Sequence, residues 1–501
     1  MSLMAAATAA PARTSKEREF MGHPTPLYTL FFVEMWERYS FYGMRALLSL
    51  FMVLPKASGG LGLSVANAAL IYGTYTCSVY MVGIPGGVLA DSVLGGRVAV
   101  LLGGLIIAAG HFSMAIPTET MFYVGLGLIV IGTGLLKPNI SAMVGQLYAP
   151  GDARRDAGFS IFYMGINIGA TLSPFVTGFL AQHSWFKEHL SAWGFNPNHS
   201  WHWGFAAAGV GMVLGVINML IYQRGLQSIG APPSRPPGFW IRPLWVTALI
   251  AVLWSVVWLS DRDGFTWIRW VLLAIPVVAM IAFGRSPDPG RRRLAAICYF
   301  FIGGIVFWAL YEQAGTSLSL FADQFTATHI LGFEVPSSWY QAAPSIFVIL
   351  LAGGFAVLWV KLGDRQPGSP MKFSIALVLL AASFALMVPA SRLAVSGRVS
   401  PLWLISVFFV QTLGELCLSP VGLSIFTKLA PPKRDGLMLG VWLLGMGLGN
   451  KFAGVLASTF GEGDASNLDR FFGRQAIAVL VVAAVFLALT PWVRRRMGDV
   501  R

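Results

Sequence analysis

Five side chains that carry charge or can exchange a proton lie in one short stretch, FFVEMWERYSFYGMRALL. They are Glu34, Glu37, Arg38, Tyr42 and Arg45. On a helix with about 100° per residue they cover a stripe about 140° wide, so all five would point the same way. Two acids beside two bases can form an ion-pair network that only locks helix packing. We favour the other interpretation, a water-filled cavity in which a change of surroundings decides whether a carboxylate holds a proton.

Four more polar side chains interrupt long apolar runs elsewhere. Lys137 lies in IGTGLLKPNISA, Glu312 in FWALYEQAGTS, Glu415 in QTLGELCLSPVGLS and Asn167 in IFYMGINIGATLSP. A charge near the centre of a bilayer costs about 2.5 to 3.5 kcal/mol, so each such residue in a membrane span predicts a function. The alternatives are a lysine that reaches an interface, two neutral structural glutamates, and an asparagine that links helices by a hydrogen bond.

The composition shows which elements must position these residues. Of 501 residues, 56% are hydrophobic and 11% are charged, and the mean hydropathy is +0.67. Soluble domains are about 25% charged. The hydrophobic content is enough for about 14 membrane helices of about 20 residues each. These values exclude a soluble enzyme with one anchor, a disordered scaffold and an outer-membrane barrel, and they predict an all-α polytopic membrane protein.

Charged or Pro/Gly-rich breaks divide the chain into fourteen apolar segments. They run over residues 28–54, 64–91, 97–116, 119–148, 156–183, 202–223, 241–260, 264–284, 293–321, 338–361, 371–390, 400–429, 435–460 and 471–493. The arrangement predicts a tail (1–27), a six-helix bundle (28–223), linkers with an inserted two-helix hairpin (224–292), a second six-helix bundle (293–493) and a tail (494–501). GGVLADSVLGGR and GGFAVLWVKLGDR, at corresponding turns, support an internal repeat, and two such halves around a midplane site are typical of alternating-access carriers.

Lysine and arginine positions predict the orientation. With a cytoplasmic N-terminus, 23 of the 35 basic residues fall in inside segments and 8 in outside loops, so both termini should be cytoplasmic. The first 25 residues lack a long apolar core, so we expect no cleaved secretory signal. The expected location is the cell (inner) membrane, with the bilayer as surroundings.

Other functions find no support in the sequence. The net charge of +13 is a topology signal, because no basic patch with interleaved aromatics predicts a nucleic-acid partner. The three cysteines lie singly in apolar runs, and four histidines in one outer loop match no ligand spacing, so we expect no metal site. No cofactor and no obligate protein partner are implied. The absence of HExxH, GxGD or serine–histidine patterns argues against an intramembrane enzyme.

Opposite charges come from opposite halves of the chain. Arg45 and Lys137 belong to the first half, whereas Glu312 and Glu415 belong to the second. A cavity with one basic and one acidic wall suits a zwitterion, because each end of the substrate meets the opposite charge.

Three motifs resemble one known family, the proton-dependent oligopeptide transporters of the major facilitator superfamily, and in particular its bacterial members. Glu34, Glu37 and Arg38 match the ExxER signature, GGVLADSVLG the signature between the second and third helices, and FYMGINIGA that of the fifth helix. The resemblance implies the major facilitator fold with two six-helix bundles and an inserted pair. It spans nearly the whole chain.

The resemblance also implies roles for single residues. Glu34, Glu37 and Arg38 would couple proton movement with Lys137 as their salt-bridge partner, and Glu312 would exchange a proton while pairing with Arg45. Arg45 and Lys137 would attract the substrate carboxylate, and Glu415 and Asn167 would hold the amino group. The residues expected to line side-chain pockets are Tyr42, Tyr80, Trp308, Ser419 and Trp442; for the two tryptophans, core packing is the alternative.

Three positions depart from the family pattern. Phe41 stands where many members have tyrosine, Ala343 where asparagine is common, and Gly73 where animal members carry a proton-linked histidine. The changes remove a hydroxyl, an amide and an imidazole, so proton coupling should depend on carboxylates.

The expected function is a proton-coupled symporter that imports di- and tripeptides by alternating access, driven by the proton gradient. The alternative is a carrier of the same fold for another small solute, such as nitrate, a drug or a peptide-like compound.

Overall fold

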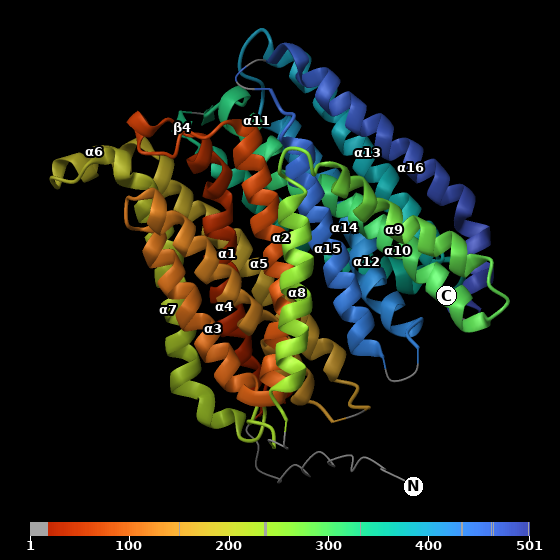
Figure 1. Ribbon diagram of the computed structural model, residues 1–501. Helices are drawn as coiled ribbons and strands as arrows, with labels where there is room; N and C mark the ends of the chain where they lie inside the picture. The colour runs from red at the N-terminus through yellow and green to blue at the C-terminus, as the bar shows by residue number, and fades with distance from the viewer. Residues whose placement is uncertain are drawn as a thin grey trace.

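The protein is almost entirely helical (Figure 1). The computed structural model describes residues 19–149, 151–234, 238–330, 332–431, 434–461, 463, 465–498 and 500. The α-helices are α1 (Pro26–Val53), α2 (Val65–Leu89), α3 (Gly96–Met114), α4 (Glu119–Gln146), α5 (Arg155–Gln182), α6 (Ser184–Ala192), α7 (Ser200–Tyr222), α8 (Ile241–Leu259), α9 (Trp267–Gly284), α10 (Pro289–Tyr311), α11 (Ser317–Phe325), α12 (Ala343–Leu362), α13 (Ser369–Ala394), α14 (Leu402–Lys428), α15 (Asp435–Ala457) and α16 (Leu468–Met497).

Short elements fill the connections. Two small hairpins pair β1 (Glu19–Phe20) with β2 (His23–Pro24) and β3 (His329–Ile330) with β4 (Phe333–Glu334). The single-turn helices are η1 (Lys56–Ser58), η2 (Ala90–Leu94), η3 (Pro197–His199), η4 (Gln223–Leu226), η5 (Glu312–Gly315), η6 (Ser337–Ala342), η7 (Gly363–Arg365) and η8 (Ala465–Asn467).

The prediction of fourteen spans is confirmed. Within the described residues, thirteen helical segments are long and apolar enough to cross a membrane. The fourteenth long helix is α1, which has 28 residues and carries Glu34, Glu37, Arg38 and Arg45 near its middle. Charge, and not length, distinguishes α1 from the other spans.

Two features of the helices differ from the sequence prediction. Residues 293–321, expected as one helix, are divided by η5 into α10 and α11. A nine-residue helix, α6, lies in the loop that the sequence left without structure. Its burial pattern extends over only two turns, which is too short for a hydropathy argument to detect.

Side-chain caps fix where several spans begin. The Ser64 hydroxyl accepts a hydrogen bond from the Asn67 amide before α2, and the Thr118 hydroxyl accepts one from the Met121 amide before α4. The Asp288 carboxylate caps α10 in the same way. Each cap satisfies an amide that the first helical turn leaves unpaired. The polar residues that separate the apolar runs therefore also fix where these helices begin.

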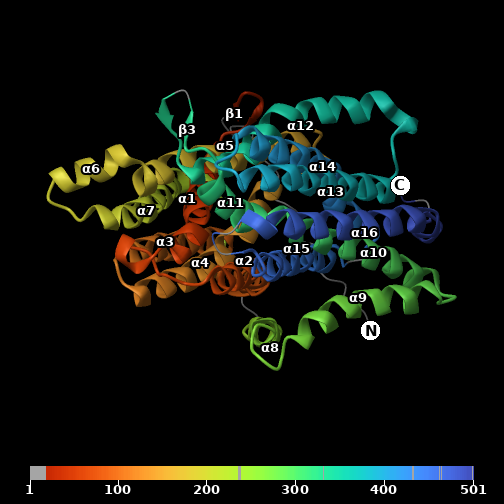
Figure 2. The same ribbon diagram turned by 90° about the horizontal axis from the view of Figure 1, so that it is seen from above.

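The long helices form two groups (Figure 2). In the first, α1 packs on α5 and α7, α3 packs on α4 and α7, and α2 packs on α4. In the second, α13 packs on α14 and α16, and α10 packs on α15. This is the expected major facilitator architecture of two six-helix bundles with an inserted pair; the exact bundle bounds, 28–223 and 293–493, stay a prediction.

The two groups meet at the upper end of Figure 1, defined here as the end that carries the α1–α2 connection, α6 and β4. Of the helix pairs that join the two groups, α2 and α15 pack against each other most extensively. A Cβ atom added to Gly73 would lie 2.9 Å from Gly454 Cα, and one added to Gly454 would lie 2.4 Å from the Ala69 carbonyl oxygen. Only glycine on both sides permits this backbone contact.

We therefore expect Gly454→Ala to destabilise the α2–α15 crossing by about 1 to 3 kcal/mol, the usual cost of overpacking. Thermal unfolding of the purified protein in detergent would measure the change. Gly440→Ala on the same helix is the matched control, since nothing lies within 4 Å of a Cβ atom at that position, and it should leave the melting temperature equal or slightly raised. Equal melting temperatures for the two variants would contradict the predicted contact.

Candidate functional site

The break between α10 and α11 places Glu312 inside the membrane-spanning region. The η5 turn leaves backbone carbonyls without helical partners, and side chains take them: Ser49 donates to the Gly315 carbonyl at 2.5 Å, and Gln341 donates to that of Ala314. Unpaired carbonyls in a membrane are costly, so such partners are needed. Gly315 is required because a Cβ atom there would lie 1.8 Å from the Tyr72 hydroxyl.

Glu312 forms a buried ion pair with Arg45. The Arg45 Nη2 and Glu312 Oε2 atoms are 2.6 Å apart, and the two residues are 7% and 4% exposed. Arg45 Nε also donates to the Tyr72 hydroxyl at 2.6 Å, and the guanidinium lies 5.5 Å from the centroid of the Tyr42 ring. The pair joins α1 of the first group to η5 of the second. Arg45 is therefore held on one side by its own group of helices and on the other by a carboxylate of the second group.

The second charged cluster lies about two turns before Arg45 on α1, nearer the N-terminal end of the helix. Arg38 Nε lies 3.3 Å from Glu34 Oε1 and donates to Glu37 Oε2, and all three side chains are buried. One oxygen of each glutamate and Nη2 of Arg38 have no hydrogen-bond partner among the described residues. Buried polar atoms without partners are costly, so these atoms could take up further hydrogen bonds. Phe41, the departure from tyrosine, lies 5.2 Å from the Arg38 guanidinium.

Lys137 corrects one expectation. The resemblance placed this lysine in a salt bridge with the α1 cluster, yet no carboxylate of the described residues lies within 4.0 Å of its ammonium. The ammonium lies instead 4.6 Å from the centroid of the Tyr80 ring. Arg38, one turn beyond Glu34 on the same helix, is the cation that pairs with both carboxylates.

Glu415 has a partner that the sequence did not predict. The Tyr311 hydroxyl, from the last residue of α10, donates to Glu415 Oε2 at 2.5 Å. Asn167 donates to the Tyr163 carbonyl of its own helix at 3.0 Å. Asn167 lies on α5 of the first group and Glu415 on α14 of the second, and their shared role at the substrate amino group stays a prediction.

The remaining predicted residues divide between a core and the inner surface. Trp442 packs against Phe426 and is 3% exposed; a Cβ atom at Gly422 would touch its ring at 2.4 Å. This arrangement matches the core-packing alternative. Trp308 lies edge-on to Tyr311, and the Trp308 indole nitrogen has no partner among the described residues.

Ser419 has a hydroxyl without a described partner next to the helix-distorting Pro420. Tyr80 and Tyr42 are half-buried beneath Lys137 and Arg45, respectively.

Several functional contacts were missed from the sequence. Tyr72, Tyr311, Ser49 and Gln341 are the partners of the site's charges and carbonyls. The signal that could have found Tyr311 is its position beside Glu312; nothing in the sequence pairs it with Glu415. Because hydroxyl and amide side chains occur throughout membrane helices, their hydrogen-bond partners depend on helix packing.

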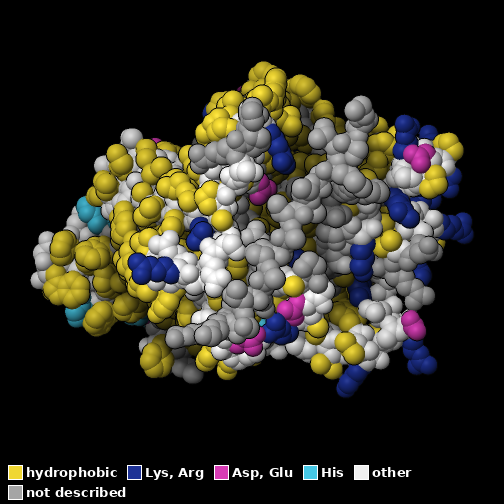
Figure 3. Space-filling model, turned by 90° about the horizontal axis from the view of Figure 1, so that it is seen from below, with side chains coloured by type: hydrophobic (Ala, Val, Ile, Leu, Met, Phe, Trp, Pro, Cys, Tyr) yellow, Lys and Arg dark blue, Asp and Glu magenta, His cyan; other side chains and the backbone are white. Residues whose placement is uncertain are grey.

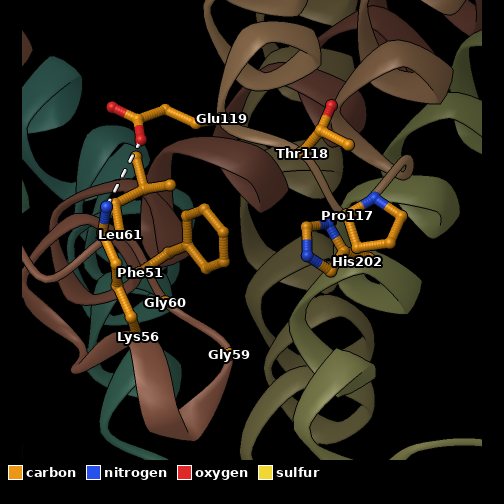
Figure 4. Close-up of a pocket in the computed structure, with 9 residues that line it drawn as sticks. All are labelled: Phe51, Lys56, Gly59, Gly60, Leu61, Pro117, Thr118, Glu119 and His202. Atoms are coloured by element: carbon orange, nitrogen blue, oxygen red, sulfur yellow. Dashed lines mark ion pairs between the residues drawn. The ribbon is translucent and has the colours of Figure 1, made fainter.

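A surface hollow at the upper end lies apart from these residues. Figure 4 shows Lys56 and Glu119 as an exposed ion pair of 3.6 Å, with Phe51, Leu61 and His202 nearby. The predicted site residues do not line it. Within the described part of the chain, no group of three or more His, Cys, Asp and Glu side chains is placed to hold a metal ion.

Polar contacts also close the upper end between the two groups. Gln182 of α5 donates to Ser337 at 2.8 Å and accepts from the Ser338 amide at 3.1 Å. The Glu334 carboxylate accepts two hydrogen bonds from Ser184, at 2.5 Å from the hydroxyl and 3.0 Å from the amide, and lies 3.4 Å from His183 Nδ1. The connections after α5 and after α11 are therefore fastened to each other.

Comparison with known sequences establishes the family. A profile of the POT family matches residues 97–473. The peptide transporter YePEPT of Yersinia enterocolitica is 38% identical, over 96% of this chain and 97% of its own.

The chain belongs to the POT family.

Further relatives agree with this assignment. A di-/tripeptide transporter of Lactococcus lactis is 35% identical over 97% of this chain and 99% of its own. A solved structure of peptide transporter POT in complex with alafosfalin has a TM-score of 0.84, with 39% identity over 96% of this chain and 98% of that one. A POT family transporter solved with 5-aminolevulinic acid has a TM-score of 0.80 and 31% identity, over 95% and 98% of the two chains. The resemblance inferred from three motifs is confirmed: this is a family of transporters and not of enzymes.

The Glu334 contacts predict a pH dependence. Burial raises the pKa of Glu334, but the hydrogen bonds from Ser184 and the nearby His183 lower it further, so the pKa lies below its ordinary value of 4.5. This contribution to stability is present above pH 4.5 and is lost as the pH falls through the lowered value. Glu334→Gln should lower stability by up to about 1 kcal/mol at pH 7, and the difference should shrink in acid. Thermal unfolding from pH 7 to pH 3.5 tests this, with the exposed Glu188→Gln as control. A difference that grows towards low pH would refute the assignment.

Proposed function

We propose that this POT family protein is a proton-coupled symporter that carries di- and tripeptides into the cell by alternating access. The observation that carries the proposal is the Arg45–Glu312 ion pair. It is buried, it joins the two groups of helices, and its carboxylate lies at a helix break. The names of the relatives support peptides as the cargo class, and the transporter solved with alafosfalin supports a peptide-like ligand.

In this proposal the Glu312 carboxylate and the substrate carboxylate compete for Arg45, and a proton on Glu312 decides between them. A proton that binds at Glu312 removes the negative charge opposite Arg45. The guanidinium, still held through Nε by Tyr72, then has Nη2 free for a substrate carboxylate. When Glu312 loses the proton towards the cytoplasm, the pair re-forms and the carboxylate is expelled. Proton binding and substrate binding are thus coupled because both act on the Arg45 guanidinium.

The other end of the substrate would meet the second group of helices. Lys137, whose ammonium has no carboxylate partner among the described residues, adds positive charge to the wall that holds Arg45. Glu415, oriented by the Tyr311 hydroxyl, supplies negative charge on the opposite wall for the amino group, with Asn167 as a further polar contact. Tyr42, Tyr80, Trp308 and Ser419 are proposed to surround the side chains, whereas Trp442 packs in the core of its own group. Glu34, Glu37 and Arg38 are proposed to pass the proton.

The topology gives this arrangement a direction. Both termini are proposed to be cytoplasmic in the cell (inner) membrane, so the upper end faces outward. Lysine and arginine side chains are visible on the lower face in Figure 3, in keeping with this orientation. The described contacts tie the groups together at the upper end, and we propose on this ground that the structure represents an inward-facing state. We propose that protons and peptide are the only ligands, and that the protein needs no cofactor and no obligate protein partner. The two bundles that move are proposed to be residues 28–223 and 293–493.

A second cargo class is a small zwitterion that is not a peptide. The family member solved with 5-aminolevulinic acid favours this candidate, because that compound also carries an amine and a carboxylate. Uptake of labelled dialanine into proteoliposomes, driven by an imposed proton gradient, would decide between them. Absence of peptide uptake together with robust flux of 5-aminolevulinic acid would replace the peptide assignment.

Glu312→Gln should abolish concentrative uptake while leaving exchange of peptide across the membrane partly intact. The neutral amide cannot bind and release the proton, yet Arg45 stays free to bind a carboxylate. Uptake under a proton gradient and counterflow without one measure the two properties separately. Glu188→Gln, the same change at an exposed carboxylate of α6, should preserve both. Retained concentrative uptake in Glu312→Gln would contradict the coupling role.

A further inference from the structure

The inserted helices α8 and α9 are each attached to a different group of helices. Helix α8 packs on α2, where the Trp254 indole donates to the Ser78 hydroxyl at 2.7 Å. Helix α9 packs on α10, and Arg496 of α16 donates to the Gly284 carbonyl at 3.0 Å. Figure 2 shows α8 beside the first group and α9 extending along the second. The turn at residues 260–266 is therefore the link between two bodies that alternating access must move.

This turn carries an acid that meets three helices at once. Asp261 accepts a hydrogen bond from Thr74 of α2 at 2.9 Å and pairs with Arg269 of α9 at 3.1 Å. It also pairs with Lys451 of α15, whose ammonium donates to Thr74 at 2.8 Å. Lys451 thus has a carboxylate partner 190 residues away in the sequence.

Lys451 lies at the α2–α15 crossing and is 1% exposed. A buried ammonium needs a counter-charge, and Asp261 is its only carboxylate partner among the described residues. The crossing is also where Gly73 and Gly454 bring the backbones into contact. Opening the upper end requires α2 and α15 to separate. That motion would break the bond between Lys451 and Thr74, and Asp261 could not keep partners on both helices.

We propose that Asp261 and Lys451 form a latch through which the inserted hairpin holds the upper end closed. The two are positioning residues: they touch neither the Arg45–Glu312 pair nor the α1 cluster. They set the balance between the closed and open upper end. This inference depends on the proposed alternating access, but it does not depend on which solute is carried.

Distances between spin labels test the latch without any substrate. One pair of labels, at the exposed Asn67 and Arg470, spans the upper end; a second pair, at the exposed Arg224 and Lys361, spans the lower end. The three native cysteines are replaced by alanine. In Asp261→Asn we expect the population with a long upper distance to rise by about fivefold or more, the lower limit of usual coupling between sites. The lower distance should shorten in the same population.

The same turn provides the matched control. Asp263→Asn makes the same chemical change two residues away, at an exposed side chain, and should leave both distances unchanged. The exchanged pair Asp261→Lys with Lys451→Asp should recover part of the closed population. In transport assays, Asp261→Asn should change the maximal exchange rate more than the apparent KM, because the substrate contacts are intact.

Other outcomes would overturn the proposal. Unchanged distances in folded Asp261→Asn, with only a lower melting temperature, would show that the pair stabilises the fold alone. If Asp261→Asn does not fold, Asp261→Asn with Lys451→Met removes both buried charges together; unchanged distances there would likewise exclude a latch. If the native protein carries no peptide but the distances shift, the peptide assignment fails and the latch stands. If peptide uptake is normal and no variant shifts the distances, the latch alone fails.

Discussion

The cost of placing charge inside a membrane determines much of this structure. An ionised side chain at the centre of a span costs several kcal/mol unless a counter-charge lies beside it. Arg45 and Glu312 satisfy each other across the boundary between the two groups of helices. Within its own group of helices, Arg45 has the Tyr72 hydroxyl as a hydrogen-bond partner, but this partner carries no charge. The requirement for a counter-charge therefore ties the two groups of helices together at this pair.

The break at η5 serves both stability and function. A continuous helix from α10 to α11 would satisfy its own backbone and offer no carbonyls to α1 or to Gln341. With the break, the backbone of the second group becomes a partner for side chains of the first, beside Glu312. Motion of the groups would expose these carbonyls, so separation needs new partners for them. A substrate or water in the opened space could supply such partners.

Two of the charged contacts that link helices near the upper end differ in chemistry. The Arg45–Glu312 pair contains a carboxylate that is proposed to gain and lose a proton during transport. The Asp261–Lys451 contact is reinforced by Arg269 and Thr74 and is carried by the inserted hairpin. In our proposals a proton on Glu312 breaks the Arg45–Glu312 pair. The Asp261–Lys451 contact then determines how readily the two groups of helices separate.

The sequence alone determined the fold class, the number of spans, the family and most of the charged residues of the site. Hydropathy and charge are properties of each segment, so spans such as α12 and α16 could be predicted without knowledge of their neighbours. What only the tertiary structure decided are the partners. Lys137 lies over the Tyr80 ring, the Tyr311 hydroxyl donates to Glu415, and Lys451 pairs with Asp261. The partner of a side chain depends on how helices that are far apart in the sequence pack together. A local pattern of residues carries no information on that packing.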